Sequence, residues 1–456
     1  GHIRDFFGKW TSTTTTTTTK STKKTKAPLF KNWENFYARR LYRRIGDVFN
    51  RPICSSPSAR IDVMGREFVD GKFRLTKEVI GGCLNLGSYN YLGFADDWLA
   101  TCGPPVLSSL EEWPVTCSSP QSELGTTMKH VELERQIAGF VGKEDAVVFN
   151  MGYGTNMTTV PAIVGKGDLV LSDALNHASL VNGCRASGAF IRSFAHNDFR
   201  ALETALREAV AFGVPRTRRP FKKILVVVEG IYSMEGEICD LKNIARVCKM
   251  YKAYLYLDEA HSIGALGPTG RGACEQCGVD PKDVDILMGT FTKSFGGMGG
   301  YVASSKKLCD HLRASCPGLT CHDSMSCVMC SQISTATHVI ANSAIGAQKI
   351  HDLKRNANYF RSELIKLGLH VYGDYDSPVI PVLLYNPTKI AAFSRECLDE
   401  KLAVVVVGFP ATTLVKSRAR FCVSAGHSLD DLKDALQKIN HIADKIKIKY
   451  AASAFG

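Results

Sequence analysis

The chain has 456 residues, more than the roughly 250–300 at which one hydrophobic core stops growing, so its length predicts two domains or one large domain with a smaller one. Hydrophobic residues make up 45% and charged residues 22% of the sequence, which excludes a mostly disordered chain, a collagen-like chain and a multispanning membrane protein. The net charge is +12, and it is unevenly placed.

The excess of positive charge lies in an N-terminal arm. Residues 1–29 contain a polar, basic run of low complexity at 11–26, and this composition predicts a solvated linker. Residues 1–50 carry +8 of the net charge, so the arm suits an acidic surface, either nucleic acid or anionic lipid. The rest of the chain carries only +4, which argues against a nucleic-acid-binding body, and no nucleic-acid partner is predicted.

Residues 30–85 are predicted to form an amphipathic helix and a lead-in segment. Between 32 and 48, apolar residues recur at helical spacing and arginines occupy the other faces. Such a helix can lie on a membrane surface or pack on its own domain, and the sequence leaves both open. No apolar run approaches the roughly 18–20 residues that span a bilayer. Sixteen cysteines without regular spacing or a signal peptide indicate a reducing compartment.

Short apolar strands alternate with helices over residues 86–335, which predicts an α/β domain with a mainly parallel sheet between two helical layers. Residues 336–456 are predicted to form a smaller α+β domain that begins with one long helix, 340–367. The predicted strands of the large domain are 146–149, 169–171, 224–229, 253–258 and 286–289, and its clearest helices are 199–212 and 240–251. Functional residues are expected just past the carboxyl ends of these strands.

A lysine flanked by hydroxyl residues follows the strand at 286–289. Lys293 is placed to form an imine with an aldehyde, while the hydroxyls of Thr290 and Thr292 can bind a phosphate nearby. The alternative is a solvated loop lysine between turn-forming residues.

Three other signals suit the same chemistry. Asp258 ends an apolar strand and needs a cationic partner to stay charged, such as a protonated pyridine nitrogen, unless it only caps the next helix. His261 can then bond the phenolic oxygen of the same ring. Gly152 and Tyr153 follow a strand and begin a helix, where free N–H groups suit a phosphate. His177 can stack on an aromatic ring, although a structural histidine is the commoner case.

With these elements in this order, the chain resembles the α-oxoamine synthase family of pyridoxal-phosphate (PLP) enzymes, of fold type I. The resemblance runs from Phe30 to Tyr450 and is specific in six segments: 31–37, 50–54, 87–94, 228–236, the Lys293 motif and 407–412. The first two segments and the last are similar to the eukaryotic long-chain-base branch of the family and set the chain apart from shorter bacterial-type relatives.

The resemblance implies a role for each site residue. Lys293 would hold the cofactor and later move the substrate proton, and His177 would stack on the ring and contact the substrate carboxylate. Arg420 would grip that carboxylate, which suits a planar guanidinium, and Asn90 would lie near the substrate. The cofactor-binding set implied in this way is Gly152, Tyr153, His177, Ser233, Asp258, His261, Thr290, Thr292 and Lys293. No metal is predicted.

The resemblance also implies an activity, partners and a location. It implies the decarboxylative condensation of L-serine with a long-chain acyl-CoA, which gives a 3-keto long-chain base, CoA and CO2 and is the first step of sphingolipid biosynthesis. The expected partner is a homologous subunit without the lysine, in a heterodimer or larger assembly at the endoplasmic reticulum membrane, facing the cytosol. Two alternatives remain: a relative that uses glycine or alanine, and a non-catalytic scaffold subunit.

Three segments depart from the family pattern. Residues 113–125 have lost glycines and carry Pro120 where relatives have an arginine, and Thr413 replaces a proline. Asp323, in 321–327, occupies the place of a threonine that helps to bind the phosphate of the neighbouring subunit, where an anion would repel phosphate. Cys327 and Cys330 have zinc-ligand spacing, but no second matching pair accompanies them.

Overall fold

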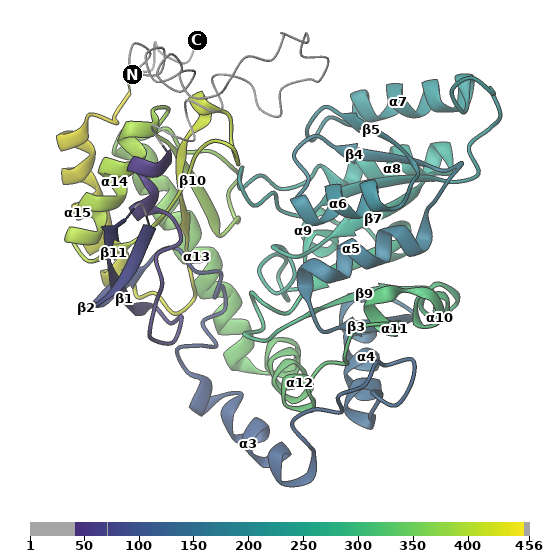
Figure 1. Cartoon of the computed structure of the whole chain (residues 1–456), viewed down its shortest axis with the longest axis horizontal. Helices are drawn as coiled ribbons and strands as arrows, with labels where there is room; N and C mark the ends of the chain where they lie inside the picture. The colour runs from purple at the N-terminus through teal and green to yellow at the C-terminus, as the bar shows by residue number, and fades with distance from the viewer. Residues whose placement is uncertain (1–41, 71, 451–456) are drawn as a thin grey trace, which may run out of the picture.

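The computed structural model describes residues 42–70 and 72–450 and shows two lobes side by side, joined below by helices (Figure 1). The predicted arm and most of the predicted amphipathic helix lie outside the described residues. Where the description begins, two short 3-10 turns, Tyr42–Arg44 and Gly46–Val48, stand in place of the end of that helix. Glycine has a low helix propensity, and a Cβ on Gly46 would come within 2.7 Å of the ring of Phe73.

The larger lobe contains a seven-stranded sheet with the order β3-β9-β8-β7-β6-β4-β5. Only β9 runs antiparallel to its neighbours, so the predicted mainly parallel sheet is confirmed. The strands are β3 (Asp145–Phe149), β4 (Leu169–Asp173), β5 (Phe190–Phe194), β6 (Ile224–Glu229), β7 (Tyr254–Asp258), β8 (Ile286–Thr290) and β9 (Gly300–Ser304).

Helices cover both faces of this sheet, as its apolar strands require. In β6, Val226 and Val228 belong to the core on one face, while Leu225 and Val227 belong to the core on the other. The first face is covered mainly by α4 (Met128–Val141), α7 (Phe199–Phe212), α8 (Leu241–Tyr251), α9 (Ala273–Cys277) and α12 (Cys327–Asn342). The second face is covered by α5 (Gly152–Ile163), α6 (Ala178–Ala186), α10 (Lys306–Ser315) and α11 (Pro317–Thr320).

The smaller lobe combines the C-terminal residues with the start of the described chain. Ile45 and Val48 share one hydrophobic core with Phe360 and Phe421, so the segment before residue 86 packs on this lobe. Its strands form two sheets, β10 (Val379–Leu383), β13 (Arg418–Cys422) and β12 (Val405–Val407) in one, and β1 (Arg60–Val69), β2 (Lys72–Asn85) and β11 (Leu402–Ala403) in the other. Its helices are α13 (Ala344–Lys366), α14 (Pro387–Asp399) and α15 (Leu429–Ile446).

The long helix predicted over 340–367 is wrong, because the structure divides it into two helices. Residue 340 belongs to α12, which ends at Asn342, and α13 begins at Ala344. Ser343 separates them: its backbone is extended, and its hydroxyl accepts the N–H of Gly346 as the N-cap of α13. Within 42–70 and 72–450, no helix is long and apolar enough to cross a membrane.

Candidate active site

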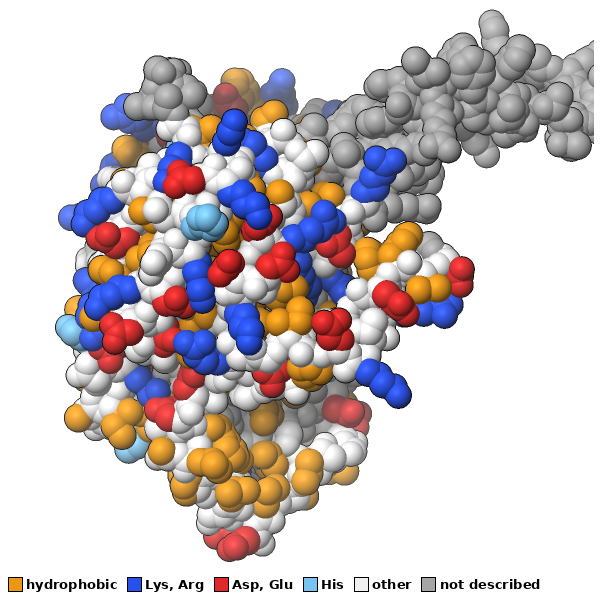
Figure 2. Space-filling model, turned by 90° about the vertical axis from the view of Figure 1, so that its left-hand side faces the viewer, with side chains coloured by type: hydrophobic (Ala, Val, Ile, Leu, Met, Phe, Trp, Pro, Cys, Tyr) orange, Lys and Arg blue, Asp and Glu red, His pale blue; other side chains and the backbone are white. Residues whose placement is uncertain are grey.

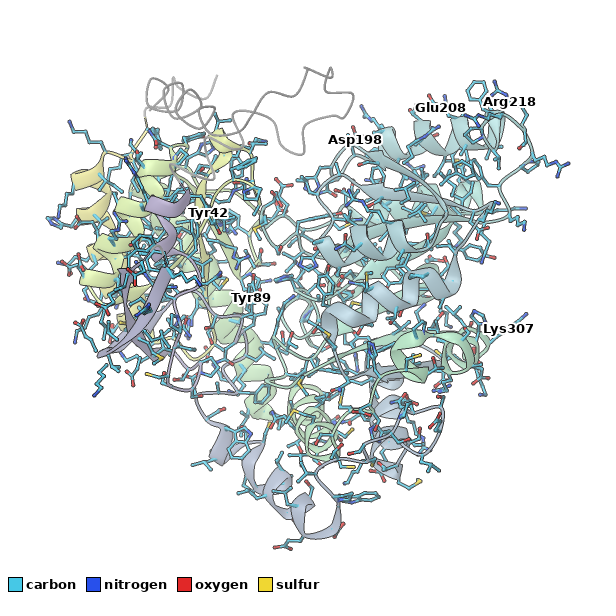
Figure 3. The ribbon with its side chains drawn as sticks, viewed as in Figure 1. Tyr42, Tyr89, Asp198, Glu208, Arg218 and Lys307 are labelled. Carbon is cyan, nitrogen blue, oxygen red and sulfur yellow. The ribbon has the colours of Figure 1, made fainter. Side chains whose placement is uncertain are left out.

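A cavity of about 430 Å³ opens at the carboxyl ends of β6, β7 and β8. Every residue of the predicted cofactor-binding set lines it, including Lys293 and Asp258 together. Tyr89 also lines the cavity and lies between the two lobes (Figure 3). The strands converge here because parallel strands present their carboxyl ends at one edge of the sheet.

Lys293 lies in the turn after β8. Its side chain lines the cavity together with those of Tyr89, Asp258 and Glu229. Its Nζ is 5.4 Å from the centre of the Tyr89 ring. Burial lowers the pKa of Lys293 to about 8, against the opposing charges of Asp258 and Glu229. A large fraction of the amine is therefore neutral near pH 8, which is the form that attacks an aldehyde. This environment favours the imine-forming interpretation over a solvated loop lysine.

Asp258 ends β7 and is 3% exposed. One carboxylate oxygen accepts the backbone N–H of Ala260 at 2.8 Å, but the residues that follow form turns and the next helix begins only at Ala273, so the helix-capping alternative is wrong. The other accepts the side-chain N–H of Asn156 at 2.7 Å. Among the described residues no cation lies within ion-pair distance of Asp258, although Lys293 lines the same cavity, so its buried carboxylate faces the cavity without a direct cationic partner. A protonated ring nitrogen would supply one.

A chain of buried hydrogen bonds joins Asp258 to His177. The amide nitrogen of Asn156 donates to Asp258 and, at 3.0 Å, to the hydroxyl of Ser179, which lies 2.8 Å from Nδ1 of His177. Tyr256 donates its hydroxyl to the Asn156 carbonyl at 2.8 Å. Sequence reasoning assigned no role to Asn156 or Ser179. The available signal was their position in the polar motifs 150–156 and 176–179, which follow strands β3 and β4.

Glu229 is a third residue that sequence reasoning missed. It ends β6 directly beside Asp258 in the parallel register, is 4% exposed, and accepts the backbone N–H of His177. Burial raises its pKa well above the usual range, and the charge of Asp258 adds to this effect. Its carboxyl group thus holds the backbone of His177 at the edge of the cavity.

His261 also lines the cavity, and two tyrosines hold its imidazole in place. Its Nδ1 is 2.8 Å from the hydroxyl of Tyr91, and its ring packs edge-on against Tyr89 with 5.0 Å between ring centres. Burial lowers the pKa of His261 well below its usual range, and the charge of Lys293 adds to this effect, so the imidazole is neutral. A neutral imidazole suits a hydrogen bond with a phenolic oxygen.

The start of α5 forms a cradle for an anion. No side chain caps this helix, and Gly152 is its first residue, so the N–H groups of the first turn face the cavity. A Cβ on Gly152 would come within 2.7 Å of the Thr290 hydroxyl, which itself lies 2.8 Å from the Thr292 hydroxyl. The buried side-chain oxygen of Asn150, which also lines the cavity, has no partner among the described residues.

The predicted substrate residues are placed differently from one another. The guanidinium of Arg420 is buried over the Tyr89 ring, 4.8 Å from its centre, and its Nη1 is 3.5 Å from the carbonyl of Ser233. Its Nε has no hydrogen-bond partner among the described residues, which leaves a donor for a carboxylate. Neither Arg420 nor Asn90 is among the residues that line the cavity. The side chain of Asn90 donates to Asp96 at 3.0 Å, and the roles of both residues in substrate contact stay predictions.

The segments 113–125 and 321–327, which depart from the family pattern, lie against each other. Pro120 and Asp323 form an antiparallel bridge, and the N–H of Ser324 donates to the carbonyl of Ser119 at 3.0 Å. The carboxylate of Asp323 is exposed. The described residues contain no group of three or more potential ligands arranged for a metal ion.

The residues of the cavity fit PLP. A buried carboxylate without a cation suits its pyridinium nitrogen, a cradle that only glycine permits suits its phosphate, and a buried amine suits its aldehyde. A family model for class I and II aminotransferases matches residues 82–439. The fold and the site therefore define a PLP-dependent transferase of fold type I.

Comparison with known proteins narrows this class. The chain is 52% identical to long chain base biosynthesis protein 2d of Oryza sativa, over 99% of this chain and 92% of the relative. It is 50% identical to serine palmitoyltransferase 2 of Dictyostelium discoideum, over 93% and 87%. The solved serine palmitoyltransferase of Sphingomonas wittichii superposes with a TM-score of 0.78 at 27% identity, covering 92% of this chain and 100% of that one. The chain belongs to the serine palmitoyltransferase family, which confirms the resemblance.

Proposed function

We propose that this chain is the catalytic subunit of a serine C-palmitoyltransferase. It condenses L-serine with a long-chain acyl-CoA and releases CO2 and CoA, which gives the 3-keto long-chain base that begins sphingolipid synthesis. The observation that carries the proposal is the meeting of Lys293, Asp258 and the Gly152 cradle in one cavity. Family members named for serine palmitoyl transfer align over nearly the whole chain.

When bound, PLP supplies an electron sink that stabilises negative charge on the α-carbon of the amino acid. The chain's residues do the rest. Asp258 keeps the ring nitrogen protonated, while His261 orients the phenolic oxygen. The backbone N–H groups of Gly152 and Tyr153 and the hydroxyls of Thr290 and Thr292 would hold the phosphate. Lys293 would hold the cofactor through Nζ, and the same atom would accept a proton from the α-carbon of the amino acid.

Arg420 and His177 position the amino acid. The free Nε of Arg420 and its burial beside Ser233 favour binding of the serine carboxylate, because a buried guanidinium and a carboxylate form a strong charge-assisted pair. His177 faces the cavity from the other side, held by Glu229 and Ser179. Holding both substrates in one site replaces a bimolecular encounter by a positioned one.

We further propose that the chain works in a heterodimer with a homologous, lysine-less subunit. Asp323 supports this arrangement, since its exposed carboxylate would repel a phosphate in a second copy of the catalytic chain. Exposed apolar side chains also gather at the lower end of the molecule in Figure 2, the level of α3 (Gly103–Glu112) in Figure 1. Leu107 and Leu110 on that helix are 53% and 44% exposed, as expected of a surface that a partner covers.

The proposed location is the endoplasmic reticulum membrane, with the catalytic lobes in the cytosol. The basic arm, with +8 in residues 1–50, suits the anionic cytoplasmic face of a membrane. Fractionation of cells that express the tagged chain, followed by protease protection of the intact vesicles, tests this. Accessible lobes in the reticulum fraction are expected, and protected lobes would contradict the proposal.

The activity is tested by co-expressing the chain with candidate lysine-less subunits and analysing products from labelled serine. The expected product is a 3-keto long-chain base. The Lys293→Ala variant should not form it, and neither glycine nor alanine should replace serine as the substrate. Arg420→Ala should raise KM for serine far more than KM for acyl-CoA. A product from glycine or alanine instead of serine would identify another α-oxoamine synthase, and a cofactor-free inactive chain would identify a scaffold subunit.

A further inference from the structure

A second cavity of this chain lies away from the candidate active site. Its volume is about 920 Å³, within the range of roughly 300–1,000 Å³ typical of small-molecule sites. It opens where β6, β7 and β8 begin and where β9 ends, and thus at the edge of the sheet opposite to Lys293. The five residues of β7 alone separate the two edges by roughly 13 Å. Figure 3 shows Lys307, at its rim, on the far side of the lobe from Tyr89.

The inner wall of this cavity is apolar. Leu225, Ile286, Ile163 and Val164 line it and are themselves 2–8% exposed. Tyr254, the first residue of the central strand β7, is 48% exposed there. An aromatic side chain that is open to solvent beside buried aliphatic residues offers an apolar surface to a ligand.

The mouth of the cavity is basic. Four lysines line it, against the two carboxylates of Glu144 and Asp285. Both carboxylates accept backbone N–H groups, of Lys306 at 3.1 Å and Leu255 at 2.8 Å respectively. Neither forms an ion pair with a lining lysine among the described residues, so positive charge is left over at the mouth.

The lysines differ in how they are held. Lys143 donates to the carbonyl of Pro281 at 2.7 Å and to that of Val284, and Lys223 donates to the carbonyl of Ile163 and lies 3.6 Å from Asp168. Lys282 and Lys307 are exposed, and their ammonium groups have no hydrogen-bond or ion-pair partner among the described residues, although the backbone N–H of Lys282 donates to Asp280. Two fixed and two free ammonium groups thus surround an apolar interior.

We propose that this cavity binds an acidic amphiphile, a carboxylate or phosphate on an alkyl chain. The alkyl chain would occupy the space between Tyr254 and Leu225, and the acidic head would lie at Lys282 and Lys307. The positive mouth rejects the amine product of the proposed reaction, so the site selects acidic lipids such as fatty acids or phospholipids. It is separate from the catalytic cavity and stands whether or not the proposed function holds.

Calorimetric titration of the PLP-loaded full chain tests the site, because loading keeps phosphate probes out of the cofactor cradle. Decyl phosphate and decanoate, used below their micelle concentrations, are expected to bind, whereas decyltrimethylammonium and inorganic phosphate are not. Comparison of the two acidic probes distinguishes a phosphate head from a carboxylate head. If the chain bound only to vesicles that contain phosphatidic acid, and to neither monomeric probe, the cavity would not be the binding site and the proposal would be wrong.

Variants locate the binding. The double variant Lys282→Glu/Lys307→Glu should raise Kd for decyl phosphate at least about tenfold, because it reverses two charges at the mouth. Tyr254→Ser should weaken binding through the apolar wall while leaving the lysines intact. The control Lys166→Glu/Lys242→Glu reverses two exposed, unpaired lysines that do not line the cavity and should change Kd less than about twofold. Equal effects of the two double variants, or binding unaffected by both mouth and wall variants, would refute the proposal.

Discussion

Single residues at this site have properties that their surroundings impose. The amine of Lys293 and the carboxylate of Asp258 are ordinary groups in the sequence, and burial in one cavity makes them reactive partners. The sequence located both, because Asp258 ends one apolar strand and Lys293 lies in the turn after another. It could not assign Asn156 and Glu229, because their roles depend on contacts between residues 102 and 52 positions apart in the chain.

The lowered pKa of Lys293 gives a pH dependence for cofactor uptake. Because only the neutral amine attacks the aldehyde, the rate at which the cofactor-free chain takes up PLP should rise with pH and level off above about pH 8. An unburied lysine would continue to gain rate until about pH 10.4. Stopped-flow absorbance across pH 6.5–10 measures this rate, and a midpoint near 10 would show that the amine is not buried.

Asn156 is expected to matter for catalysis although it does not itself react. Asn156→Ala leaves the buried Asp258 and Tyr256 each without one hydrogen bond, at a cost of about 1–3 kcal/mol for each unsatisfied group. Turnover should fall at least about tenfold, and the absorbance of bound PLP should shift. Asn182→Ala, which removes only a bond to the Tyr153 hydroxyl, is the control and should retain activity within about threefold.

The sequence predicted those strands and helices that bury one or both of their faces. Strand β6 and helix α7 have the predicted bounds, since their apolar patterns are regular. Strand β13 was missed because it carries Arg418 and Arg420, whose burial depends on partners far away in the sequence. Strand β9 was not predicted, because glycines precede it. The break at Ser343 was not predicted either, because its cap consists of one hydrogen bond, from the N–H of Gly346 to the Ser343 hydroxyl.

The first turn of α5 should tolerate no side chain. Gly152→Ala places a Cβ 2.7 Å from the Thr290 hydroxyl, so the cradle must shift and PLP affinity should fall at least about tenfold. The control is Gly139→Ala in α4, where an added Cβ meets nothing within 4 Å. It should stabilise the chain by about 0.5–1 kcal/mol through helix propensity. Fluorescence titration with PLP measures the first effect, and urea unfolding measures the second. Unchanged PLP affinity in Gly152→Ala would show that the start of α5 does not bind the phosphate.

At the scale of the whole molecule, the loop after β6 joins the two lobes at the site. It carries Ser233, and the buried Arg418 of β13 donates to the carbonyl of Met234 at 2.6 Å and pairs with Glu235 at 3.2 Å. Farther along, the N–H of Ile238 donates to Asp374 at 2.7 Å. The position of Arg420, the proposed substrate-binding residue two positions after Arg418, therefore depends on contact between the lobes.

Loss of Arg418 should weaken the whole fold. Arg418→Ala leaves Glu235 buried without its partner, and breaking a buried pair costs about 3–5 kcal/mol, whereas an exposed pair is worth about 0–1 kcal/mol. The exposed pair Lys433–Asp430 offers the control Lys433→Ala, for which a loss below about 0.5 kcal/mol is expected. Urea unfolding of both variants measures this, and equal losses would show that the lobes are not held by Arg418.

The central claim is that one amine in this chain holds PLP, and covalent trapping tests it most directly. The PLP-loaded chain is reduced with borohydride, digested, and analysed by mass spectrometry. One pyridoxyl-phosphate group is expected on the peptide that contains Lys293, and none in Lys293→Ala. A label on another lysine, or no label on the folded wild-type chain, would contradict it.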